Sequence, residues 1–120
     1  MKIALLAAVT ASLSNVAQAE PLTCHWANKQ QCDPNSACRP SVNKVWATVD
    51  ATAKRYQRCD SKGCDSYDAE VSASGVYTTF DLPGRGVFMK IGPEGAATEV
   101  VSLGNSVLVS QGTCRPTPSN

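Results

Sequence analysis

Apolar and polar side chains alternate along much of the chain between residues 44 and 114. In residues 66–74, the clearest case, one face consists of Tyr67, Ala69, Val71 and Ala73. The intervening residues are acidic or carry hydroxyls. A period of two places one set of side chains on each side of a β-strand, so this segment predicts a half-buried strand.

Turns that contain glycine divide the same region at short intervals. Residues 83–86, 92–95 and 104–105 each end one β-favouring segment and begin the next. Short turns of this kind join neighbouring antiparallel strands. We therefore predict an all-β fold, an antiparallel meander of about seven strands that forms a small barrel or a two-layer sandwich, because closure hides strand edges.

Residues 44–58 fit two interpretations. Apolar residues from Val45 to Tyr56 recur at a spacing that one face of a helix would also show. However, Val, Trp, Thr and Tyr are frequent here, and no capping residue begins a helix. We favour two strands joined near residues 50–54.

The segment that precedes this region shows no apolar period of either kind. Residues 20–43 contain three prolines, three cysteines and the turn signature Asp-Pro-Asn-Ser. We predict an irregular, disulfide-held loop that forms one globular unit with a β domain of residues 44–114, with Trp26 as the apolar plug between them. Residues 115–120 are expected to form a flexible tail.

The first nineteen residues have the order of a signal peptide. Lys2 precedes an apolar run, and Ala17 and Ala19 supply the small residues that a signal peptidase reads. The run is far shorter than the roughly 20 residues that cross a bilayer. We expect cleavage near Ala19 and a periplasmic or secreted protein without membrane insertion.

Charge narrows the range of partners. The full sequence has a formal net charge of +1. Removing residues 1–19 takes away Lys2 and no acid, which leaves ten basic residues against ten acidic ones. A neutral chain without a cluster of lysine and arginine lacks the electrostatic character of a nucleic-acid binder, so we expect no nucleic acid as partner.

The exported part holds an even number of cysteines, which predicts three disulfides. The six are Cys24, Cys32, Cys38, Cys59, Cys64 and Cys114. Spacing alone does not choose among the possible pairings, but Cys59 and Cys64 flank a turn-forming tetrapeptide and are expected to pair across a hairpin. The other four are expected to tie the N-terminal loop to itself and to the last strand.

No residue pattern indicates a catalytic centre, a metal site or a cofactor. His25 is the sole histidine and lies between Cys24 and Trp26, where a structural role fits best. The cysteine spacings do not match structural zinc sites, and the acidic segment 60–68 lacks the order of an EF-hand. We therefore expect a protein that is not an enzyme and binds no metal or cofactor.

Three short stretches support a resemblance to known proteins. They are the sequence RCDSKGCD at 58–65, SASG at 72–75 and GTC at 112–114. In these the chain resembles a group of small, uncharacterised, cysteine-rich exported proteins of Gram-negative bacteria. The resemblance implies export and one disulfide-linked domain, and implies nothing about activity.

A second resemblance concerns binding. The sequence SASGVY, a later lysine before a glycine and a terminal cysteine strand are similar to the membrane-bound inhibitors of c-type lysozyme, which are small periplasmic β-barrels. In that family a Ser-Gly-x-x-Tyr motif and a downstream lysine enter the lysozyme cleft. The resemblance implies binding roles for Ser74, Tyr77 and Lys90. Only Val76 separates Gly75 from Tyr77, one residue fewer than in the family motif.

Together these observations favour an exported, non-enzymatic structural or interaction protein with a protein partner. The alternative is a periplasmic inhibitor of c-type lysozyme. A third hypothesis is a small secreted hydrolase. Two acidic residues far apart in the sequence can form a catalytic pair in the folded protein, and sequence spacing does not reveal such a pair.

Overall fold

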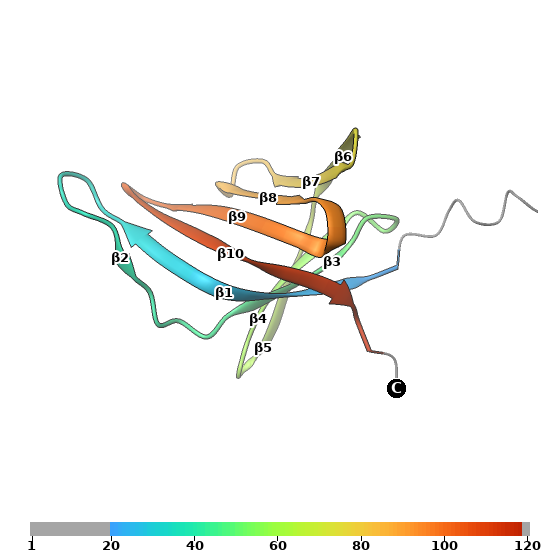
Figure 1. Ribbon diagram of the computed structural model, residues 1–120, viewed down its shortest axis with the longest axis horizontal. Coiled ribbons are helices and arrows are strands. Elements are labelled where there is room, and N and C mark those ends of the chain that lie inside the picture. The colour runs from blue at the N-terminus through green and yellow to red at the C-terminus, as the bar shows by residue number, and fades with distance from the viewer. Residues whose placement is uncertain (1–19, 119–120) are drawn as a thin grey trace, which may run out of the picture.

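The computed structural model describes residues 20–118 and shows an all-β protein (Figure 1). Its strands are β1 (Leu22–Cys32), β2 (Arg39–Pro40), β3 (Trp46–Asp50), β4 (Arg55–Asp60), β5 (Gly63–Asp68), β6 (Glu70–Ser74), β7 (Tyr77–Leu82), β8 (Val87–Ile91), β9 (Ala96–Leu103) and β10 (Ser106–Pro116). A 3₁₀ turn, η2 (Pro93–Gly95), lies between β8 and β9. The predicted fold class is confirmed, with more strands than we expected. The proposed signal peptide lies outside the described residues.

The strands form one antiparallel sheet that curls into a nearly closed barrel. The order of pairing is β5-β4-β3-β1-β10-β9-β8-β7-β6, and β2 pairs with β1. The two ends of this path, β5 and β6, are separated in the chain only by Ala69, whose N–H donates to the carbonyl oxygen of Lys54 at 3.0 Å. Residues 63–74 therefore act as one bent strand, paired with β4 along its first half and with β7 along its second.

The N-terminal segment corrects our prediction of an irregular loop. Residues 22–32 form β1, which lies between β3 and β10 in the middle of the sheet. The register shifts between Trp26 and Asn28, so a β-bulge breaks the alternation at this point. Because of this bulge, the segment does not show the regular period of two that predicts a strand. Trp26 is half-buried and packs against the core as predicted, but it does so from a strand of the sheet and not from a loop.

A disulfide-held loop is present, but it is shorter than predicted. It begins after Cys32, at the end of β1, and the Cys32–Cys38 bond closes it. The chain then returns along β1 through the short strand β2. The loop therefore projects from the end of a strand that belongs to the barrel.

The predicted flexible tail is wrong for its first residues. Arg115 and Pro116 belong to β10 and pair with β1. The N–H of Thr117 donates to the carbonyl oxygen of Pro21 at 2.9 Å. The two ends of the described chain are therefore hydrogen-bonded neighbours, and residues 119–120 lie outside the description.

The alternatives at residues 44–58 are settled in favour of two strands. β3 and β4 pair along their lengths, with Val49 opposite Tyr56. Asp50 accepts a hydrogen bond from the N–H of Ala53 at 2.9 Å, which closes the turn between them. The helical interpretation is wrong.

All six cysteines form disulfides. Cys59 pairs with Cys64 as predicted, across the β4–β5 hairpin, with a Cα–Cα distance of 4.0 Å. Cys32–Cys38 ties the N-terminal segment to itself, and Cys24–Cys114 ties it to the last strand. Disulfides of this kind are typical of an oxidising environment outside the cytoplasm.

The barrel interior is mainly apolar. The largest fully buried side chains are Tyr56, Phe80 and Met89, from β4, β7 and β8. Figure 1 shows β1, β10 and β9 as long strands side by side. The predicted binding residues Ser74, Tyr77 and Lys90 are exposed on the outer faces of β6, β7 and β8.

Candidate functional site

The predicted binding residues begin at the β6–β7 hairpin. Gly75 and Val76 form its two-residue turn, and Gly75 has φ of +61°, which glycine adopts without strain. The register places Ser74 directly opposite Tyr77. Both side chains therefore lie on one face of the hairpin.

Lys90 comes from the neighbouring strand β8 and joins this face. It lies opposite Thr79, two residues beyond Tyr77 on the same side of β7. Its Nζ is 5.2 Å from the centre of the Tyr77 ring, a distance typical of a cation–π contact. The structure thus brings Ser74, Tyr77 and Lys90 onto one outer face, which we call the Ser74–Lys90 face.

A shallow groove of about 310 Å³ runs along this face. Tyr77 and Lys90 lie at one side of it, and Thr98 and Gln111 lie on β9 and β10. A Cβ at Gly92 would come within 2.7 Å of the Tyr77 ring, so the ring rests directly on the backbone there. An open groove of this kind suits contact with a protein surface better than enclosure of a small molecule.

The charge of Lys90 is unpaired. Among residues 20–118 the ion pairs are Arg39–Asp33 and Arg55–Asp68, and neither involves this lysine. Tyr77 is 44% exposed, and the neighbouring Val76 is 69% exposed. The face therefore offers an ammonium group, a hydroxyl and an aromatic ring, a combination that suits a partner carrying carboxylates.

A second polar group of residues, absent from the predictions above, lies inside the barrel. The register aligns Lys29, Ser110 and Glu99 across β1, β10 and β9. Glu99 is only 3% exposed and accepts a hydrogen bond from the hydroxyl of Tyr56. One signal was available, because Glu99 alternates in phase with the buried residues Ala97 and Val101.

Burial controls the protonation of this interior cluster. It raises the pKa of Glu99, and the hydrogen bond from Tyr56 and the charges of Arg58 and Lys29 oppose that effect. Burial also lowers the pKa of Lys29, aided by the charge of Arg58. For Tyr56, burial followed by the Glu99 charge raises the pKa far above its ordinary value. Glu99 is therefore an enclosed carboxyl group whose hydrogen-bond donor is the hydroxyl of Tyr56.

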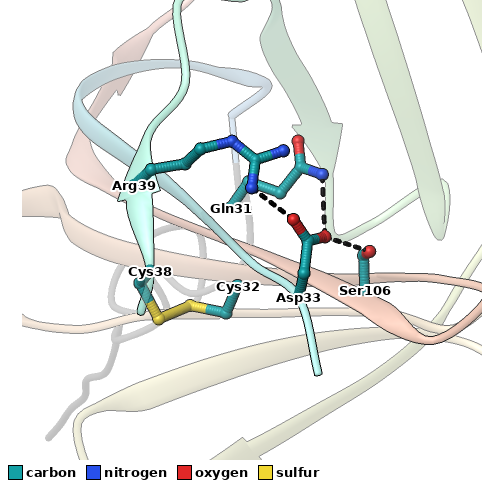
Figure 2. Close-up of a disulfide and its surroundings, with 6 residues drawn as sticks. All are labelled: Gln31, Cys32, Asp33, Cys38, Arg39 and Ser106. Carbon is teal, nitrogen blue, oxygen red and sulfur yellow. Dashed lines mark hydrogen bonds and ion pairs between the residues drawn. A yellow bond between two sulfur atoms is a disulfide. The ribbon is translucent and has the colours of Figure 1, made fainter. Parts of the chain in front are cut away.

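A third polar cluster holds the disulfide-closed loop (Figure 2). Asp33 accepts hydrogen bonds from the Gln31 side chain, at 3.0 Å, and from Ser106. It also forms an ion pair with Arg39. The hydrogen bonds from Ser106, Gln31 and Arg39, in that order, lower the pKa of Asp33 to about 2. With Cys32–Cys38, these contacts fix the start of the loop.

The remaining candidate of the sequence is its one histidine. His25 is exposed and its ring stacks on Trp46, with ring centres 6.5 Å apart. Within residues 20–118, no group of three or more His, Cys, Asp or Glu side chains is placed to hold a metal ion.

The described part of the chain contains no helix with the length and apolar character needed to cross a membrane. Comparison of the sequence and structure with family models, curated proteins and solved structures found no match. The Ser74–Lys90 face therefore has to be interpreted from its own geometry.

Proposed function

We propose that this protein is an exported, non-enzymatic binding module and that a protein partner docks on the Ser74–Lys90 face. The observation that carries the proposal is the position of Lys90, whose ammonium lies 5.2 Å from the centre of the Tyr77 ring and forms no ion pair with any other residue between 20 and 118. Three disulfides and the signal-like sequence of residues 1–19 support export to the periplasm or beyond.

The barrel provides a rigid support for such a face. Tyr77 and Lys90 project from strands that pair along their lengths, and the cross-strand contact between the hydroxyls of Ser72 and Thr79, at 2.8 Å, links β6 to β7. Binding residues held on a rigid scaffold lose little freedom when the partner docks. A partner with a carboxylate aligned on Lys90 would form a charge-assisted hydrogen bond.

Affinity capture tests the proposal. The mature protein is immobilised and exposed to periplasmic extract, alongside Lys90→Glu and Tyr77→Ala. Lys62→Glu is the matched control, because Lys62 is exposed on the distant β4–β5 turn. We expect a protein that binds the wild type and the control and is lost with both face variants. If all four proteins retain the same set of partners, the proposal is wrong.

A second candidate is inhibition of c-type lysozyme. It is favoured by one observation, that Ser74, Tyr77 and Lys90 share a face although they come from three strands. A lysine ammonium and a serine hydroxyl suit a cleft lined by two catalytic carboxylates.

A lysozyme turbidity assay tests this candidate separately. The mature protein is expected to slow clearing of a bacterial suspension at micromolar concentration, Lys90→Ala to do so at least about tenfold less well, and Lys62→Ala to equal the wild type. No inhibition by the wild type removes the lysozyme candidate and leaves the broader binding proposal to the capture experiment.

A further inference from the structure

The bent strand formed by β5 and β6 directs its backbone groups to two different neighbours. Its first half pairs with β4, and the N–H of Ala69 continues that side by donating to Lys54 at 3.0 Å. In an antiparallel ladder, every second residue directs its N–H and C=O to the same neighbour. Val71 and Ala73, which follow Ala69 by two and four positions, therefore direct theirs to the β4 side.

The β6–β7 hairpin gives the same result independently. In a hairpin with a two-residue turn, the pair that flanks the turn exchanges both backbone hydrogen bonds. This pair is Ser74 and Tyr77, so the alternate residue Ser72 also bonds to β7. Val71 and Ala73 again direct their backbone groups away from β7.

Nothing in residues 20–118 pairs with this side of β6. The β4–β5 ladder ends at Arg55 opposite Asp68, before β6 begins, and β6 is one of the two ends of the sheet. The N–H and C=O groups of Val71 and Ala73 therefore form a free strand edge. We call it the β6 edge.

The two free edges of the bent strand differ in protection. On β5 the free backbone groups belong to Cys64, Ser66 and Asp68, and Asp68 carries a charged side chain that is 91% exposed. Charged side chains are a common means of preventing a sheet from accepting another strand. The β6 edge has the sequence EVSAS, in which Glu70 is the one charged residue and the others are small or β-branched.

We propose that the β6 edge pairs antiparallel with the β6 edge of a second copy of this chain, about a two-fold axis at Ser72. In this register Val71 lies opposite Ala73 of the second copy, and these two exchange their free backbone hydrogen bonds. The same exchange occurs again on the other side of the axis. The interface is therefore isologous, with one surface used by both copies.

Side chains along the edge suit this pairing. The two Glu70 carboxylates lie at opposite ends of the interface, so they do not repel each other directly. Each lies opposite Ser74 of the other copy, whose hydroxyl is able to donate a hydrogen bond to it. Val71, which is half-buried in one copy, gains cover from the facing alanine.

A proline substitution tests the edge without breaking the hairpin. Ala73→Pro removes the outward N–H and leaves the β7 ladder intact, because that N–H does not bond to β7. Ser66→Pro is the matched control on the free side of β5. By sedimentation equilibrium over a concentration series, we expect the wild type and Ser66→Pro to approach twice the monomer mass, and Ala73→Pro to stay monomeric.

Amide exchange provides a measurement that needs no variant. In concentrated wild-type protein the amides of Val71 and Ala73 should exchange at least about tenfold more slowly than in dilute protein, since pairing closes them off from water. The exchange rate of the Ser66 amide, which points to the free side of β5, should be the same at both concentrations. A wild type that is monomeric at every concentration, or one whose dimer both prolines weaken equally, overturns the proposal. The proposed function is tested separately, by partner capture with variants of Tyr77 and Lys90, which lie outside β6.

Discussion

Two carboxylates of this protein meet opposite conditions. Glu99 is enclosed inside the barrel, where burial raises its pKa and the Tyr56 hydroxyl is its hydrogen-bond donor. Asp33 lies at the start of the disulfide-closed loop, where hydrogen bonds from Ser106 and its other neighbours lower its pKa to about 2. Burial in the interior thus disfavours the charged form of Glu99, whereas the hydrogen bonds at the loop favour the charged form of Asp33. Each region also contains a disulfide, but the barrel interior depends on burial and the start of the loop depends on local polar contacts.

The largest expected effect comes from the disulfide Cys24–Cys114, which joins β1 to β10 inside the barrel sheet. Replacing Cys24 and Cys114 with alanine together should lower the free energy of unfolding by about 2–5 kcal/mol. This bond joins residues 90 positions apart, whereas Cys32–Cys38 spans 6, and a longer loop loses more unfolded-state freedom when it is closed. Urea unfolding of both double variants measures the difference. An equal loss from the Cys32/Cys38 variant would contradict the comparison.

The next largest effects on stability are expected from removing the hydroxyls of Tyr56 and Ser106, which donate to Glu99 and Asp33. Tyr56→Phe should lower the free energy of unfolding by about 1–3 kcal/mol, because it leaves a buried carboxylate without its donor. Ser106→Ala should cost less, since Asp33 keeps Gln31 and Arg39. Guanidinium unfolding midpoints at neutral pH measure both. A larger effect from Ser106→Ala would mean that the loop, and not the interior, limits stability.

The smallest effect is a difference in pH dependence. For Glu99 the folded pKa lies above the usual 4.5, so its contribution to stability is greatest below that pH and is lost as the pH rises through the folded pKa. For Asp33 the contribution is complete above 3.8 and is lost as the pH falls toward about 2.

Isosteric amides separate the two carboxylates. Relative to Glu99→Gln, the wild type should become less stable as the pH rises above 4.5, and relative to Asp33→Asn it should become less stable as the pH falls below 3.8. Thermal unfolding between pH 2 and neutrality, recorded for all three proteins, checks both directions. Slopes of the same sign for both variants would contradict the assignment.

Much of the fold followed from local pattern. The alternation in residues 66–74 and the glycine turns after it are properties of adjacent residues, so these strands and the hairpin disulfide Cys59–Cys64 could be predicted. The central position of β1 could not. Its alternation is broken by the bulge after Trp26, and its main partner, β10, lies at the far end of the sequence.

The candidate sites divide in the same way. Ser74 and Tyr77 are close in sequence, and their hairpin was predicted together with them. The interior cluster depends on Tyr56 and Glu99 meeting across the barrel, 43 positions apart, which no local pattern reveals. The one local indication was that Glu99 alternates in phase with the apolar residues Ala97 and Val101, which predicts an inward-facing side chain.

The place of β1 between β3 and β10 also has a consequence for biosynthesis. The chain is made from its N-terminus, so one of the first segments to emerge needs the last strand as its neighbour. Until then Cys24 has no native thiol to oxidise with, while Cys32 and Cys59 already have partners a few residues downstream. The two hairpin-scale bonds are therefore expected to form first, and the Cys24–Cys114 bond only once β10 is available to pair with β1.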